Sequence, residues 1–276
     1  MAQSNDLPFD LSLLEGELQQ EDAPDPLDLI DDCDQSEAVP EALLQDALRQ
    51  LQGNQEEQLQ GLKVFCEHRD PRSQPLLRPL LGSSCPILRM SAVYALGRNP
   101  DPQALPQLQQ LFRLDSNCFV RKALAWTLGN YPEAEVVPDL LNALRLDNAA
   151  VRLWAAGSLA DAALAQPQQL DTVTRELLLA LQVDGQAEVR SNCAWGLGRL
   201  HSVLAPEAQA ELVHGLLQTL LNDNDFGVRQ DARSALEQLG DGHVLAKLQA
   251  FQKVSLPLMS SCSISSPEMR KQTAWP

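Results

Sequence analysis

The chain has 276 residues, of which 44% are hydrophobic and only 4% aromatic, and its formal net charge is −16. This length is enough for one large domain or two small ones, and the scarcity of aromatic residues argues against a β-sandwich. The acidic balance argues against a nucleic-acid binder and against a polybasic protein of the membrane surface.

Targeting and membrane signals are missing from the sequence. No apolar run approaches the roughly 18 residues that cross a bilayer, so no membrane insertion is expected. The first residues lack a basic region followed by an apolar stretch, which argues against a secretory signal. Six cysteines are too few for a disulfide scaffold, and we therefore expect a cytoplasmic, reduced protein.

The negative charge is concentrated at the N-terminus. Residues 1–48 contain fourteen acidic and no basic side chains. Such a segment cannot bury enough apolar surface to offset its ordering entropy, and we expect residues 1–40 to be disordered. Residues 7–14 and 26–31 mix acidic with apolar side chains. The alternative is that these two clusters are docking motifs for a groove on this chain or on a partner.

Five later segments align without gaps on one arginine, with an apolar residue before it and a leucine seven residues after it. The arginines and their leucines are Arg89, Arg121, Arg152, Arg190 and Arg229, and Leu96, Leu128, Leu159, Leu197 and Leu236. Positions −1, +3 and +7 from the arginine share one face of a helix. Each segment is therefore predicted to be a helix with one buried face.

An Asp or Asn cluster precedes four of these helices, and a second amphipathic run, such as 105–112 or 137–144, lies upstream. Each repeat is thus predicted to be a helix, a short Asp-bearing turn and a second helix that carries the arginine. The arginine is expected to pair with the aspartate of its own or the adjacent turn.

A single pair of these helices leaves an apolar face that only its neighbours can cover. We therefore expect an all-α, right-handed solenoid of about five to six helix pairs over residues 41–252. The Ser-rich residues 253–276 are expected to be a disordered tail. The Asp…Val-Arg pattern resembles that of the HEAT-repeat family over about residues 55–251, and this resemblance implies an extended binding surface.

The common motifs of catalysis are absent from the sequence. The sequence contains no Gly-x-x-x-x-Gly-Lys loop, no Gly-x-Ser-x-Gly elbow and no Cys-x-x-Cys pair. The four histidines form no repeated His-Glu pairs, which argues against deoxyhypusine hydroxylase, a HEAT-like di-iron enzyme. No catalytic residue is assigned, and whether the chain is an enzyme stays open.

Two cysteines, Cys85 and Cys118, precede the repeat arginine by four and three residues and so fall in successive turns. Helix N-termini lower the pKa of a thiol. One hypothesis is that they capture a soft metal, an iron–sulfur cluster shared with a partner, or an electrophilic prosthetic group. The alternative is that they are unrelated turn cysteines.

Aromatic residues recur five positions after the arginine, at Tyr94, Trp126 and Trp195. This position lies about 160° from +3 on a helical wheel, so these rings either pack beneath the first helix or line a ligand-facing surface. In the second case, rings beside Arg121 and Arg190 would suit a planar conjugated acid such as an open-chain tetrapyrrole.

The runs 90–98, 119–130 and 150–156 resemble cyanobacterial HEAT proteins of the phycobilin-lyase superfamily, related to the E and F lyase subunits. The resemblance implies a cyanobacterial, cytoplasmic protein that works with another polypeptide. Some members attach or detach linear tetrapyrroles on phycobiliproteins, and a sister branch partners an A-type iron–sulfur carrier. The long acidic N-terminus departs from the compact lyase pattern.

Three functions remain open at this point. The first is a binding scaffold that assists cofactor assembly on a partner, by sharing an iron–sulfur cluster through Cys85 or Cys118. The second is a phycobilin lyase or lyase subunit, with Tyr94, Trp126 and Trp195 holding a transient phycobilin. The third is a protein–protein adaptor without a cofactor. The sequence establishes no cofactor and does not address the oligomeric state.

Overall fold

The computed structural model describes residues 39–132 and 134–240, and the chain divides into two compact units, residues 1–101 and 102–276. The segments expected to be disordered, 1–40 and 253–276, lie outside the described residues except for Val39 and Pro40. The last part of the expected solenoid, residues 241–252, also lies outside them.

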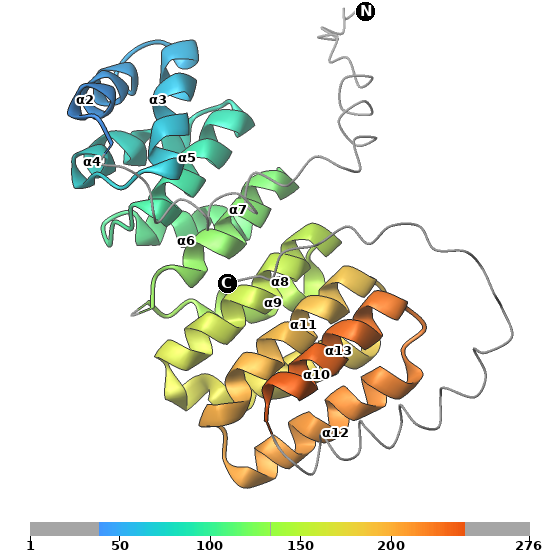
Figure 1. Cartoon of the computed structure of the whole chain (residues 1–276). Coiled ribbons are helices and arrows are strands. Elements are labelled where there is room, and N and C mark those ends of the chain that lie inside the picture. Colours follow the sequence, from blue (N-terminus) through green and yellow to red (C-terminus); the bar gives the residue numbers. More distant parts are fainter. Residues whose placement is uncertain (1–38, 133, 241–276) are drawn as a thin grey trace, which may run out of the picture. The chain divides into compact units, whose positions relative to one another are not determined.

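The first unit contains the helices α2 (Glu41–Gln50), α3 (Gln55–Glu67), α4 (Gln74–Leu77) and α5 (Pro86–Arg98). Two 3₁₀ turns, η2 (Pro71–Ser73) and η3 (Arg78–Gly82), flank α4. Helix α2 packs on α3, and α3 packs on α5 (Figure 1). The Asn54 side chain begins α3 by accepting from the N–H groups of Glu56 and Glu57, which satisfies two backbone donors at the helix start.

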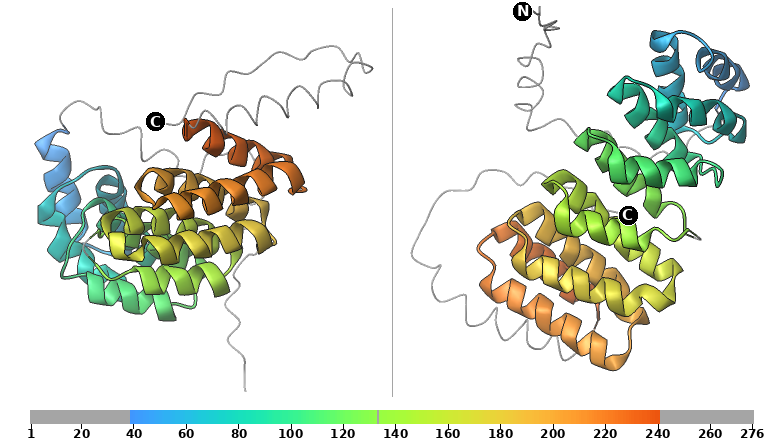
Figure 2. Two further views of the ribbon diagram at one scale, coloured as in Figure 1. Left: turned by 90° about the horizontal axis from the view of Figure 1, so that it is seen from below. Right: turned by 180° about the vertical axis from the view of Figure 1, so that it is seen from behind.

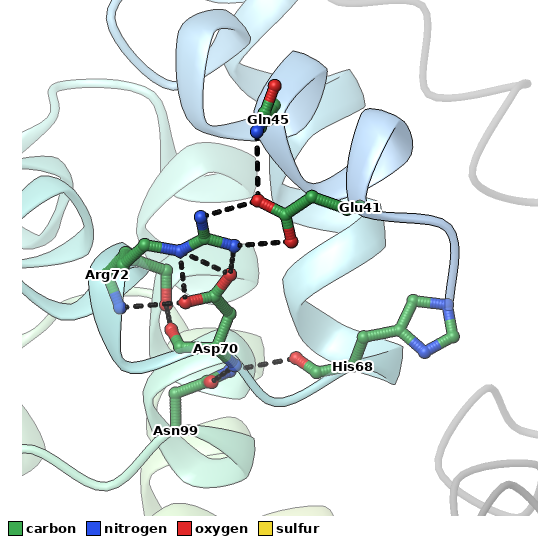
Figure 3. A network of polar contacts seen from close by, with 7 residues as sticks. Glu41, Gln45, His68, Asp70, Arg72 and Asn99 are labelled. Atoms are coloured by element: carbon green, nitrogen blue, oxygen red, sulfur yellow. Dashed lines mark hydrogen bonds and ion pairs between the residues drawn. The ribbon is translucent and has the colours of Figure 1, made fainter. Parts of the chain in front are cut away.

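A polar junction holds the first unit together where α2, α3, η2 and the end of α5 meet (Figure 3). Asn99 is buried; its amide donates to the carbonyl of Phe65, and its oxygen accepts from the N–H of Asp70 at 2.7 Å. Arg72 donates to Glu41 on α2 and to the buried Asp70, at 2.7 and 2.5 Å. Side-chain hydrogen bonds thus replace the regular helix contacts that the short α4 cannot provide.

Within its described residues, 102–132 and 134–240, the second unit contains four helix pairs. They are α6 (Leu105–Leu114) with α7 (Cys118–Gly129), α8 (Val137–Leu146) with α9 (Ala149–Ala165), α10 (Leu170–Val183) with α11 (Ala187–Leu200), and α12 (Pro206–Asn222) with α13 (Phe226–Gln238). The second helices, α7, α9, α11 and α13, pack side by side in one layer, and α6, α8, α10 and α12 form the other layer (Figures 1 and 2).

The predicted buried face is present in both units. The leucine seven residues after each repeat arginine is fully buried, and so is the apolar residue directly before four of the five arginines, while Leu88 is 1% exposed. The twelve α-helices of the described residues form six stacked pairs, which confirms the all-α class and the predicted number of pairs. The handedness of the superhelix stays a prediction.

Small residues allow the helices of the α7–α13 layer to approach closely. A Cβ atom at Gly129 of α7 would lie 2.7 Å from the Oγ of Ser158 on α9. A Cβ atom at Gly198 of α11 would lie 3.2 Å from the Cβ of Ala235 on α13. Glycine at this repeat position therefore sets the distance between neighbouring helices.

Candidate functional site

The repeat arginines of the second unit form a ladder between successive turns. Arg121 donates from Nε and Nη2 to Asp147, Arg152 donates in the same way to Asp184, and Arg190 donates to Asp223, all at 2.7–2.8 Å. Each Nη1 donates to a backbone carbonyl of the preceding turn. Arg121, Arg152 and Arg190 thus form the ion pair that we expected, and the partner is the aspartate of the following repeat.

The ladder aspartates are held in place on their own side as well. The Oδ1 of Asp223 accepts from the N–H of Asp225, and Asp147 and Asp184 accept similar backbone bonds. The hydrogen bond from Arg190 lowers the pKa of Asp223, against the opposing effect of burial. The helix caps come from other side chains, those of Asn117, Asn148 and Asp225. The ladder therefore fixes the register between repeats.

The two remaining repeat arginines make the same kind of bond from Nη1 to the backbone of the preceding turn. Arg89, in the first unit, donates from Nη1 to the carbonyls of Ser83 and Ser84. Arg229 donates to the carbonyl of Asp223, and its guanidinium lies 5.6 Å from the ring centre of Phe226.

An exposed tryptophan marks the outer face of the second-helix layer. Trp195 on α11 is 46% exposed, and the guanidinium of Arg199 lies 4.6 Å from its ring centre. Arg199 also pairs with Asp161 on α9 at 2.5 Å. The guanidinium of Arg199 thus lies over this ring, and its ion pair with Asp161 ties it to α9.

Helix α9 presents a glycine beside Trp195. A Cβ atom at Gly157 would lie 3.9 Å from Cζ3 of Trp195 and 3.4 Å from Nδ2 of Asn192. The amide of Asn192 donates to the carbonyl of Leu153 at 2.6 Å, which ties α11 to α9. We call the residues Gly157, Asp161, Asn192, Trp195 and Arg199 the α9/α11 seam.

The other aromatic residues of the predicted site are half-buried. Tyr94 lies on α5 in the first unit, and Trp126 lies on α7 in the second unit. Helix α9 packs between α7 and α11, so Trp126 and Trp195 lie on alternate helices of one layer with Gly157 of α9 at the same repeat position. Their role in holding a planar ligand stays a prediction.

The cysteines of the predicted site belong to different units. Cys85 precedes α5 as its N-cap residue, Cys118 is the first residue of α7, and both are partly exposed. Among the described residues, no group of three or more His, Cys, Asp or Glu side chains is arranged to hold a metal ion. Cys193 is buried and Cys66 is half-buried, and desolvation of its thiol raises the pKa of Cys66 to about 12.

Sequence reasoning missed most of the α9/α11 seam. The spacing of Trp195 and Arg199 by four residues is a signal for contact on one helix face and could have revealed that pair. Asp161 and Gly157 lie on a different helix, and no local pattern connects them with Trp195. Their proximity to Trp195 can be recognised only from the structure, in which the register of α9 against α11 is known.

Two family models match parts of the chain. The model for HEAT repeats matches residues 41–123, and the model for the PBS lyase HEAT-like repeat matches residues 120–145. Among the curated proteins, none matches this sequence.

Several solved structures are similar. A designed armadillo repeat protein in complex with the peptide (KR)4 is 21% identical over 71% of this chain and 98% of that one, with a TM-score of 0.54. A Kap121p mutant is 19% identical over 80% of this chain and 25% of that one, with a TM-score of 0.59. The complex of CpcE and CpcF of phycocyanin lyase from Nostoc sp. PCC7120 is 24% identical over 60% of this chain and 99% of that one, with a TM-score of 0.48.

Fold and comparisons together define an all-α protein of stacked helix pairs, a solenoid of the HEAT and armadillo type. In the two described stretches, 39–132 and 134–240, no helix combines the length and apolar character needed to cross a membrane.

Proposed function

We propose that this chain is a helical-repeat scaffold that binds a partner protein through the α9/α11 seam. The exposed ring of Trp195 is the observation that carries the proposal, because tryptophan and arginine dominate the binding energy of protein interfaces. The contacts of Trp195 with Arg199 and of Arg199 with Asp161 hold the ring before a partner arrives. A side chain that is already ordered loses less entropy on binding.

The fold supports an extended partner rather than a compact ligand. Stacked repeats present long surfaces on which successive helices contribute equivalent positions. The glycine at position 157 leaves the backbone of α9 accessible beside Trp195. A similar fold holds the peptide (KR)4 in the designed armadillo protein, which supports a peptide segment as the element bound here.

The test is quantitative co-purification of partners from cells of the native source, by mass spectrometry, with the wild type and the Trp195→Ser variant. We expect the recovery of the specific partner to fall at least about tenfold, because truncated hot-spot residues cost about 2 kcal/mol or more. Val203→Ser is the matched control, since Val203 is 49% exposed and lies in η5 (His201–Val203). Equal recovery of the partner with Trp195→Ser and Val203→Ser would show that the partner does not bind through the α9/α11 seam.

The partner is proposed to be a protein that receives or carries a cofactor in the cytoplasm of a cyanobacterial cell. The match of residues 120–145 to the PBS lyase HEAT-like repeat supports this choice, together with the family resemblance of the sequence. One form of the proposal is an iron–sulfur cluster shared with a carrier protein through Cys85 or Cys118. Anaerobic purification with the carrier should then give a broad visible absorption band that the Cys85→Ser and Cys118→Ser variants lose.

A second candidate function is that of a phycobilin lyase or lyase subunit. It is favoured by the position of Trp126 inside the matched PBS lyase HEAT-like repeat. Added phycocyanobilin should then give a red-shifted, protein-bound spectrum that is transferred to an apo-phycobiliprotein. A protein that stays colourless with the carrier and with the bilin, yet still retains a partner, would be a cofactor-free adaptor.

A further inference from the structure

Large apolar side chains are exposed at one repeated position of the second unit. Leu114, Leu146 and Val183 each stand directly before a ladder or turn aspartate, and their exposed fractions are 73%, 77% and 67%. They end α6, α8 and α10, which pack side by side in one layer. Exposed apolar residues are ordinary when scattered, but these three occupy equivalent positions of neighbouring helices and therefore form one row.

Exposed arginines accompany the first two of these leucines. Arg113 pairs with Asp139 of α8, and Arg145 pairs with Glu176 of α10. The arginines are 58% and 53% exposed, whereas the carboxylates are only 11% and 20% exposed. Each pair therefore turns its positive end toward solvent and keeps its negative end beneath. We call Arg113, Leu114, Arg145 and Leu146 the turn edge.

The turn-edge arginines retain free hydrogen-bond donors. Arg113 and Arg145 use Nε and Nη2 for their carboxylates, and within the described part of the chain neither Nη1 has an acceptor. The ladder arginine Arg121 differs, because its Nη1 is bonded to the carbonyl of Asp115 and its side chain is 21% exposed. The outer arginines can thus accept a new carboxylate without giving up their existing pair.

The turn edge also borders a hollow. A cavity of about 240 Å³ lies between α6, α7 and α8 and is lined by Arg113, Arg121, Asp139, Asn142 and Leu146, among others. It offers space beside an exposed leucine and an exposed guanidinium, which suits a side chain of an incoming segment.

We propose that the turn edge docks an acidic, leucine-rich segment of a partner protein. Carboxylates of the segment bond the Nη1 groups of Arg113 and Arg145, and its apolar side chains cover Leu114 and Leu146. Neighbouring helices lie about 10 Å apart, and one three-residue turn of a polyproline II segment spans about the same distance and returns to the same side. The fitting segment therefore places an acidic and an apolar residue once in every three positions.

Other occupants suit the turn edge less well. A basic segment would bring its cations against two exposed guanidiniums. In a two-fold contact between two copies of the chain, the same arginines would meet across the interface and repel each other. The net charge of −16 opposes an acidic segment at long range, but charges beyond about 8 Å are largely screened at physiological ionic strength.

The test uses the full chain and a fluorescein-labelled peptide of four Asp-Leu-Ser triplets, followed by fluorescence anisotropy in about 0.15 M salt. A peptide of four Lys-Leu-Ser triplets is the charge control. We expect the Asp peptide to bind at least about tenfold more tightly than the Lys peptide, and to bind more weakly as the salt concentration rises. Equal binding of both peptides, or none, would overturn the proposal.

The double variant Leu114→Ser, Leu146→Ser locates the contact. It should raise the Kd of the Asp peptide about tenfold or more, because burial of one leucine contributes about a factor of ten in affinity. Both leucines are exposed, so helical circular dichroism should stay unchanged, and Val203→Ser should leave the Kd unchanged. An unchanged Kd in the double variant would refute the site. A different pair of results would assign the turn edge to a second copy of the chain. In that case the wild type does not bind the peptide, and the double variant has a lower sedimentation coefficient than the wild type.

Discussion

At the scale of single residues, two glycines on neighbouring helices have opposite tolerance for a methyl group. In Gly129→Ala the added Cβ would lie 2.7 Å from the Oγ and 2.9 Å from the Cβ of Ser158, so α7 and α9 must shift. We expect a loss of about 1–3 kcal/mol in unfolding free energy. In Gly157→Ala the nearest atom is 3.4 Å away, and the better helix propensity of alanine should raise stability by up to about 1 kcal/mol.

Urea unfolding of the two variants checks this prediction. Equal stability of Gly129→Ala and Gly157→Ala would show that the α7–α9 contact is looser than the structure has it.

The carboxylate of Asp223 makes the stability depend on pH. The hydrogen bond from Arg190 lowers its folded pKa below the usual 3.8, so folding favours the ionised form. This contribution is complete above about pH 5 and is lost as the pH falls from about 4 through the lower folded pKa. The Asp223→Asn variant should therefore lose less stability than the wild type between about pH 5 and pH 2.5, as measured by urea midpoints. Parallel pH curves for both proteins would contradict the assignment.

Side-chain contacts that recur in several repeats could be predicted from the sequence, whereas contacts that occur once could not. The pairing of Arg121, Arg152 and Arg190 with aspartates followed from a pattern present in several copies. The contact of Trp195 with Arg199 was signalled only by their spacing of four residues, and the pairing of Arg199 with Asp161 required the register between two helices. Single-copy contacts between helices leave no periodic trace in a sequence.

At the scale of helices, two rows of ion pairs connect neighbouring repeats and differ in burial. Arg152 and Asp184 are 19% and 7% exposed, whereas Arg145 and Glu176 are more open to water. Double-mutant cycles to alanine, measured by urea unfolding, should give a coupling of about 1.5–3 kcal/mol for the first pair. The exposed pair should give about 0.2–1 kcal/mol. Equal coupling energies would mean that the ladder does not hold the repeats together.

The junction around Asn99 connects the elements of the first unit (Figure 3). The Asn99→Ala variant would leave the buried N–H of Asp70 and the carbonyl of Phe65 unpaired, at about 1–3 kcal/mol for each buried group. Hydrogen exchange should become faster in α3 and α5 and stay unchanged in α12 and α13, because repeats contact only their neighbours. Uniform acceleration along the described chain would show global cooperativity instead.

Helix pairing was predictable because it depends on patterns within about ten residues. The buried faces of α7, α9, α11 and α13 followed from the spacing of the arginine and leucine. The short α4 between two 3₁₀ turns was not predicted, since its role depends on Asn99 and Arg72 from elsewhere in the unit. The pattern also did not predict which side chain of each Asp/Asn cluster caps the helix. The first aspartate joins the ladder, and a following Asn or Asp caps the helix.

At the scale of the molecule, the residues that support the fold differ from those of the two proposed binding surfaces. Buried leucines, glycines and the arginine ladder hold the repeats in register. The α9/α11 seam and the turn edge lie on different layers of the second unit and use side chains that the packing leaves exposed. This separation is typical of repeat proteins, in which surface residues can vary while the stacking is kept.

Hydrogen exchange of the complex with the co-purified partner tests the central claim most directly. The account predicts that the partner slows exchange in α9 and α11 around Gly157 and Trp195, and that Trp195→Ser abolishes this protection while the free variant exchanges like the wild type. Protection confined to other helices, or protection at the seam that survives Trp195→Ser, would contradict it.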